Sequence, residues 1–226
     1  MQKTLNTVGT IALGAVLITG PWHHNPTKLY KHVVPSVVSI ESYGTRIDPY
    51  DIQNRVKGRR SLGAGFVVKR GHVVVTNFHV IEDSEEIHVK SRFIRDVKAT
   101  LVYVDPLQDI AILTLPEGVD GAKSAILCGR EPHIGDALYA IGSPFGLEFS
   151  MSQGIVSGLN REINGVALIQ TDASINPGNS GGPLFSADGC VVGMATSIIS
   201  ESGSSAGVGF GIPTETLKNA LAQIDN

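Results

Sequence analysis

The 226-residue sequence predicts one compact all-β domain of the sandwich or barrel type, and three observations support this. Short apolar runs rich in β-branched residues recur along the chain, for example at 37–40, 73–76, 110–113 and 191–196. The 26 glycines and 11 prolines provide frequent turns between such runs. Helical periodicity appears only near the two ends. Many short strands with frequent turns are typical of β-sandwiches and β-barrels.

The first 26 residues are expected to be a leader or an N-terminal membrane anchor. After a basic start at Lys3, a charge-free apolar stretch runs from Thr7 to Thr19. This pattern is typical of a signal-peptide core, and it is shorter than the roughly 18 residues that a membrane-spanning helix needs. An extra strand or helix of the fold is the alternative interpretation.

Two short helices are expected to flank the strands. The first runs from Thr27 to Val34 and is stopped by Pro35, since proline breaks a helix at the residue before it. A C-terminal helix at about 214–224 begins with Thr214 as its cap and carries apolar residues on one face. Those apolar residues are Leu217, Leu221 and Ile224.

Charge and composition exclude several classes of protein. Charged residues make up 17% of the chain and hydrophobic residues 42%, which excludes an intrinsically disordered protein. The net charge of −3 argues against a dedicated nucleic-acid binder, so the basic residues between Arg55 and Arg60 are interpreted as a solvated loop. The sequence contains no Walker-type phosphate-binding motif. No ATP-driven step, metal or cofactor is expected.

The two cysteines, Cys128 and Cys190, lack the spacing of a zinc site. Each lies beside apolar residues, so we expect two buried free thiols. A disulfide between them stays open, because exported proteins permit one.

The strongest chemical signal is the hexamer at 178–183, in which glycines surround Ser180. A serine on such a tight turn can expose its hydroxyl while nearby N–H groups converge on one point, as acyl transfer requires. Two further candidates are His79, directly after an apolar strand, and Asp109, directly before one. Their order along the chain, His then Asp then Ser, is that of the chymotrypsin-type triad.

At these residues the chain resembles the HtrA/Deg (Do-like) family of serine proteases, over about residues 33–221. The matching stretches are 63–66, 76–80, 109–113, 141–146, 154–157, 169–184 and 207–213. The resemblance implies a chymotrypsin-like double six-stranded β-barrel. The protease domain would span 27–226, with the first barrel at about 33–125 and the second at about 126–212.

The resemblance also implies roles for individual residues. His79, Asp109 and Ser180 would form the triad, and the N–H groups of Gly178 and Ser180 the oxyanion hole. Arg161 matches an arginine on a regulatory loop of the family. The pocket for the residue before the cut would be lined by Ile175 and by Ile198, with Ile199 as the alternative to Ile198. No acidic residue lies in 174–176 or 196–199 to pair with lysine or arginine, so an apolar pocket is expected.

The implied function is an ATP-independent serine endopeptidase that cleaves unfolded or damaged polypeptides after small aliphatic residues. Two alternatives stay open: a non-cleaving, chaperone-like holdase and a dedicated processing protease with one substrate. Family members usually carry PDZ domains after the protease domain, and none is expected within these 226 residues. We expect an exported protein (periplasm, cell envelope or an organelle lumen), with membrane tethering as an option. A homotrimer assembled through Trp22, Leu29 and Tyr30 is also expected.

Overall fold

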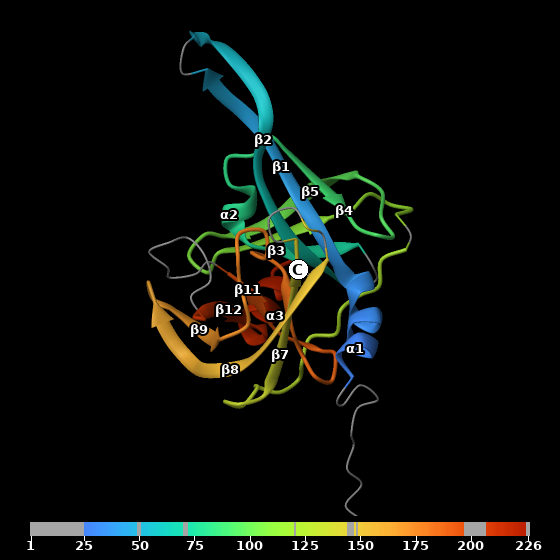
Figure 1. Ribbon diagram of the computed structural model, residues 1–226. Coiled ribbons are helices and arrows are strands. Elements are labelled where there is room, and N and C mark those ends of the chain that lie inside the picture. Colours follow the sequence, from blue (N-terminus) through green and yellow to red (C-terminus); the bar gives the residue numbers. More distant parts are fainter. Residues whose placement is uncertain are drawn as a thin grey trace, which may run out of the picture.

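Two closed antiparallel barrels make up most of the molecule (Figure 1). This computed structural model describes residues 25–48, 51–69, 72–119, 121–143, 147, 149–196 and 207–224, with backbone alone at 45–48, 51–57, 59 and 60. The first barrel has the order β1-β2-β3-β6-β5-β4 and the second β10-β11-β12-β9-β8-β7. The predicted double six-stranded fold is confirmed.

The strand bounds are as follows. The first barrel contains β1 (Val37–Asp48), β2 (Asp51–Val68), β3 (Val73–Thr76), β4 (Glu86–Lys90), β5 (Val97–Asp105) and β6 (Ile110–Thr114). The second contains β7 (Ala137–Gly142), β8 (Ser150–Ile163), β9 (Val166–Thr171), β10 (Pro183–Ser186), β11 (Val191–Ala195) and β12 (Gly209–Pro213).

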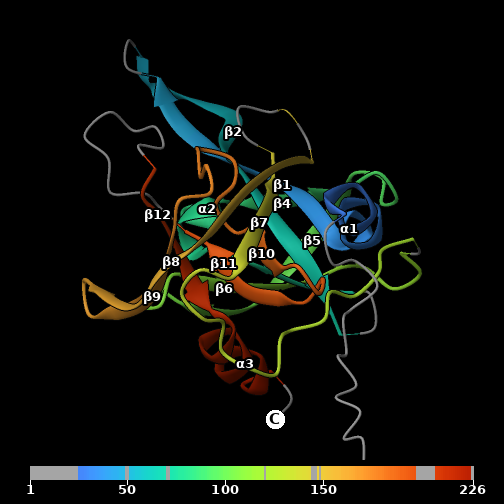
Figure 2. The same cartoon turned by 60° about the horizontal axis from the view of Figure 1, so that its bottom comes forward.

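Short helices lie at both ends of this arrangement (Figure 2). The helix α1 (Pro26–Val33) begins where the side chain of Asn25 accepts a hydrogen bond from the Lys28 N–H group, and the 3-10 turn η1 (Val34–Ser36) follows. The helix α3 (Thr214–Ala222) starts at the predicted residue. The expected cap is wrong, however, because the Thr214 hydroxyl donates to the Val191 carbonyl at 2.7 Å.

The apolar core explains why the strand sequences are continuously apolar rather than alternating. In β3 all four residues are buried. Val74 packs inside the first barrel, whereas Val75 belongs to a second cluster shared by both barrels, α1 and α3. Strands that are covered on both faces read as unbroken apolar runs. Leu29 lies in the shared cluster with 1% exposure, so its expected role at a trimer contact is wrong: it packs in this chain's own core.

The segment from Gly44 to Arg60 is a hairpin, and the expectation of a solvated loop is wrong. The strands β1 and β2 continue past the barrel and project from it in both views (Figures 1 and 2). Opposed residues include Thr45 with Lys57 and Ile47 with Arg55. Alternating β-branched residues favour strand pairing here despite the high charge.

Cys128 and Cys190 form a disulfide, so the expectation of free thiols is also wrong. The chain between the barrels runs beside β11 through a bridge between Leu127 and Val191. This brings together two cysteines that lie 62 residues apart, a proximity that the local sequence of neither cysteine indicates.

The predicted leader, with Trp22, lies outside the described residues. Within the described part of the chain, no helix is long and apolar enough to cross a membrane.

Candidate active site

The predicted histidine and aspartate meet because two turns of the first barrel lie side by side. His79 is on the one-turn helix α2 (Phe78–Ile81), which follows β3, and Asp109 directly precedes β6, the neighbour of β3. The His79 Nδ1 atom lies 2.8 Å from Oδ2 and 3.0 Å from Oδ1 of Asp109. The backbone N–H of His79 donates to the same Oδ1 at 3.0 Å. The carboxylate therefore sets both the position and the orientation of the imidazole.

Thr196, at the end of β11 in the second barrel, also contacts this carboxylate. Its hydroxyl donates to Oδ2 of Asp109 at 2.8 Å. Burial acts to raise the pKa of Asp109, but the hydrogen bonds and charge of His79, together with the Thr196 hydroxyl, outweigh it and hold that pKa below its ordinary value. Asp109 is therefore ionised at neutral pH. Sequence reasoning missed Thr196, because nothing local indicates that its strand ends beside Asp109.

The turn that carries Ser180 packs directly against the strands leading to His79. The N–H of Ala64 donates to the Ser180 carbonyl at 2.8 Å. Gly181 has a φ of +83°, and a Cβ atom there would clash with the Ala64 carbonyl and the Thr76 hydroxyl. Only glycine allows this close approach. The structure thus brings the predicted nucleophile's turn against Thr76 and Asn77, which directly precede α2.

The predicted oxyanion residue Gly178 lies in a turn of defined type, directly before Asn179 and Ser180. The Asn179 N–H donates to the Asn176 carbonyl at 2.9 Å, and Gly178 has a φ of +101°. Pro177 followed by a residue with positive φ is the pattern of a type II turn. The Gly178 carbonyl accepts a hydrogen bond from the Ser143 N–H at 3.0 Å, which ties the turn to the end of β7.

Of the other predicted site residues, Arg161 and Ile175 lie in the second half of the chain, with the second barrel. Arg161 in β8 donates from Nε to the Gln170 side-chain oxygen in β9 at 2.9 Å and packs over Gly158. Ile175 is 1% exposed and packs beside Gly209 of β12. Ile198 lies outside the described residues.

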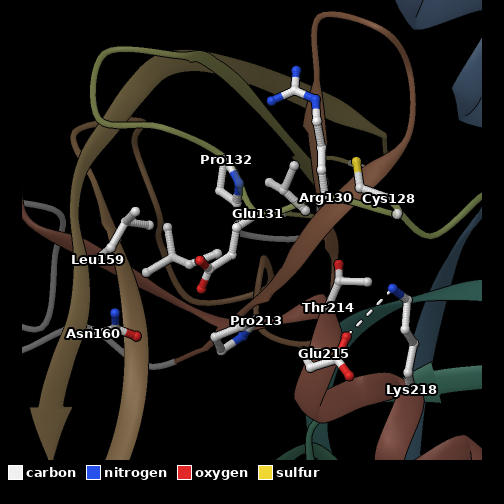
Figure 3. A pocket seen from close by; sticks show the side chains of 13 residues that line it. Cys128, Arg130, Glu131, Pro132, Leu159, Asn160, Pro213, Thr214, Glu215 and Lys218 are labelled. Carbon is white, nitrogen blue, oxygen red and sulfur yellow. Dashed lines mark ion pairs between the residues drawn. The ribbon is translucent and has the colours of Figure 1, made fainter.

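An open cleft of about 700 Å³ lies beside His79 and Asp109. Its other walls come from the turn before β6 and from the β8–β9 hairpin, and they include Leu107, Ile163, Val166 and Leu168. This size and largely apolar lining suit an extended peptide. A separate hollow of about 70 Å³ is lined by Glu131, Leu159 and the start of α3 (Figure 3). It is too small for such a substrate and contains none of the predicted site residues.

Residues 63–194 match the family model described as trypsin-like peptidase domain. The chain belongs to the trypsin-like peptidases. Among curated relatives it is 37% identical to "Protease Do-like 1, chloroplastic" of Arabidopsis thaliana, over 87% of this chain and 46% of the relative. It is 39% identical to "Probable periplasmic serine endoprotease DegP-like" of Halomonas elongata, over 82% of this chain and 40% of the relative. This trypsin-like peptidase therefore spans less than half the length of both relatives.

Solved structures of HtrA-type proteases match the same region of the peptidase. A variant of the HtrA-type protease AlgW with a decapeptide superimposes with a TM-score of 0.81 and 31% identity, over 87% of this chain and 65% of that one. AlgW with a tripeptide superimposes with a TM-score of 0.76 and 33% identity, over 87% of this chain and 62% of that one. The resemblance to the HtrA/Deg family is confirmed: this is an HtrA-type chymotrypsin-fold protease domain.

Replacing Thr196 with valine should lower the free energy of unfolding by roughly 1.5 to 3 kcal/mol at neutral pH, because it removes a hydrogen bond to a charged group. The depressed pKa of Asp109 contributes stability above the unfolded-state pKa, and this contribution is lost as pH falls through the folded-state pKa. Thr196→Val raises the folded-state pKa, so its difference from wild type should shrink at low pH. Urea denaturation from pH 7 to pH 3 measures this.

Thr100→Val, at an exposed position of β5, is the matched control for that series and should change stability by less than about 0.5 kcal/mol. A Thr196→Val deficit that stays constant down to pH 3 would show that the hydroxyl does not act through Asp109.

Proposed function

We propose that this chain is a serine endopeptidase in which Asp109, His79 and Ser180 form the triad. The observation that carries the proposal is the Asp109 carboxylate held against His79 Nδ1 at 2.8 Å. The turn of Ser180 packs against Thr76 and Asn77, which directly precede the helix of His79. The names of the Do-like and DegP-like relatives support it.

The proposed reaction proceeds in two steps. The Ser180 hydroxyl attacks the scissile carbonyl carbon while His79 Nε2 takes its proton, and the N–H groups of Gly178 and Ser180 stabilise the resulting oxyanion. The imidazolium, stabilised by ionised Asp109, then gives its proton to the leaving amine as the peptide bond breaks. A water molecule then attacks the acyl-enzyme while His79 takes its proton. The bond to Ser180 breaks, His79 returns that proton to the Ser180 oxygen, and the new carboxylate product is released.

Replacing Ser180 with alanine should abolish cleavage of casein while leaving the unfolding transition unchanged, because one oxygen atom is removed. Asp109→Asn should lower kcat by about 10⁴, since it favours the wrong tautomer of His79. Both are measured with labelled casein under steady-state conditions.

A fluorophosphonate probe distinguishes the enzyme from a non-cleaving holdase. Wild type should be labelled at Ser180 alone, and Ser180→Ala should remain unlabelled. A folded wild-type protein that binds unfolded casein but neither cleaves it nor takes up the probe would refute the protease proposal in favour of the holdase.

The proposed substrates are unfolded or damaged polypeptides, cut after Val, Ala, Ile or Leu. The pocket for the residue before the cut is assigned to Ile175, which packs against Gly209, and to Ile198, which lies outside the described residues. No acidic residue in 174–176 or 196–199 could neutralise a lysine or arginine. Such aliphatic side chains are buried in folded proteins and become accessible on unfolding. We further propose that Arg161 helps to order the oxyanion turn, through its hydrogen bond to Gln170 in the strand next to β12.

Cleavage sites in unfolded casein should therefore cluster after small aliphatic residues when mapped by mass spectrometry. A majority of cuts after Lys and Arg, or after Phe and Tyr, would show that the pocket is not the one proposed. Cuts at a single sequence in a whole-proteome digest would favour a dedicated processing protease.

An exported location is proposed from the apolar segment at 7–19 and from the words "periplasmic" and "chloroplastic" in the names of the relatives. Recovery of the protein in the soluble cytosolic fraction of its own cells would contradict this.

A homotrimer is proposed through Trp22 and Tyr30. The Tyr30 hydroxyl donates to the Phe149 carbonyl at 2.8 Å, and the Arg92 guanidinium lies 5.9 Å and 5.8 Å from the centres of the two rings. Phe149 is buried, whereas Tyr30 stays partly exposed on α1 and would supply the contact. Light scattering of the chain from Pro21 onward should give three times the monomer mass, and the mass of a single copy would reject the trimer.

A further inference from the structure

One buried residue beside the proposed triad has no role in the mechanism above. Asn77 stands between β3 and α2, two residues before His79, and is 0% exposed. Its side-chain Nδ2 group donates to the backbone carbonyl of Asp109 at 2.9 Å. The contact therefore reaches the proposed acid through its main chain and not through its carboxylate.

The backbone of Asp109 needs such support. Its φ is +54°, in the left-handed region that side chains other than glycine occupy only at a cost in free energy. A residue persists there when its surroundings hold it. Here the Asp109 carbonyl accepts two hydrogen bonds, from Asn77 Nδ2 and from the Phe78 N–H at 3.2 Å.

The three consecutive residues 77–79 thus all form hydrogen bonds with Asp109 in the neighbouring turn. Asn77 and Phe78 hold the carbonyl of Asp109, and His79 holds its carboxylate through both the backbone N–H and Nδ1. Rotation of the Asp109 backbone toward the ordinary region would swing its Cα–Cβ bond and carry the carboxylate away from Nδ1. The carbonyl contacts therefore determine where the carboxylate points.

The side-chain oxygen of Asn77 lowers the stability of the fold, and the hydrogen bond from its Nδ2 group must offset this loss. Its Oδ1 atom is buried and has no hydrogen-bond partner among the described residues, and a buried polar atom without a partner destabilises the fold. An apolar side chain of the same size would avoid that penalty. The contribution of the amide at this position therefore lies in its Nδ2 group.

We propose that Asn77 is a positioning residue, which orients the Asp109 carboxylate toward His79 by holding the Asp109 carbonyl. This inference rests on the proposed protease function. It assigns to Asn77 an effect on turnover rather than on substrate affinity, because Asn77 is fully buried and reaches the reaction only through Asp109.

The test compares Asn77→Leu with wild type. Leucine matches the shape of asparagine and removes both the donor and the orphaned acceptor, so the unfolding transition should stay near that of wild type. In contrast, kcat should fall about 10- to 100-fold with KM unchanged, as expected for a small misplacement of a catalytic group. The acid limb of the kcat profile should move to lower pH, because a displaced carboxylate stabilises the imidazolium less.

Ser39→Ala is the matched control. Ser39 is likewise fully buried in the first barrel, and its oxygen has no hydrogen-bond partner in the described part of the chain. Its replacement should leave kcat and the pH profile unchanged. Should Asn77→Leu not fold, Asn77→Ser, a smaller residue without the amide, is measured in its place.

Two results would overturn the inference: a folded Asn77 variant with wild-type kcat and acid limb, or one whose loss of activity follows only its loss of stability. Failure of the protease proposal itself would look different, since wild type would then neither cleave casein nor take up the fluorophosphonate.

Discussion

The geometry of the site depends on the apolar cluster that the two barrels share. Residues such as Val37, Phe66, Ile141 and Phe185 belong to this one cluster, together with Leu29 of α1 and Leu217 of α3. Because protein interiors are close-packed, a change of volume in this cluster is transmitted as a shift of one barrel against the other. His79 and Asp109 come from the first barrel, whereas Ser180 and Thr196 come from the second. The distance between these two pairs of residues therefore depends on the packed cluster.

Hydrogen bonds between the two barrels add to the apolar packing that holds them together. Ala64 and Thr76 of the first barrel contact the turn of Ser180 and Gly181, and Thr196 of the second barrel donates to Asp109. Apolar contact is non-directional, so it brings the barrels together without fixing their rotation. Hydrogen bonds have narrow geometry, and here they specify that rotation at the place where the chemistry requires it.

Electrostatics then determine the state of the acid. Burial alone would favour a neutral Asp109, and the surrounding donors reverse that preference. The same donors come from α2 and from the end of β11, which links the charge of the site to the formation of both barrels. In an unfolded or loosely packed chain, the Asp109 carboxylate would lose the hydrogen-bond donors that keep it ionised.

Much of the fold and site followed from the sequence because the relevant signals are local. The unbroken run at 73–76 marks a strand buried on both faces, and the glycines around Ser180 mark a turn that no other residue could form. The sequence left the cysteine pairing undecided, because the two cysteines are far apart along the chain. The prediction of the Thr214 cap failed because its hydroxyl bonds to distant Val191. The prediction for 44–60 failed because a loop and a hairpin are both acceptable structures for that segment.

By itself, then, the sequence determined the class of fold and the identities of the proposed triad, since strand periodicity, turn glycines and residue order are properties of neighbouring residues. Only the tertiary structure decided which groups surround the acid. Asn77 and Thr196 contact Asp109 from 32 and 87 residues away. The first contact forms only when β3 pairs with β6, and the second only when the two barrels pack together, because neither pair of residues is close along the chain.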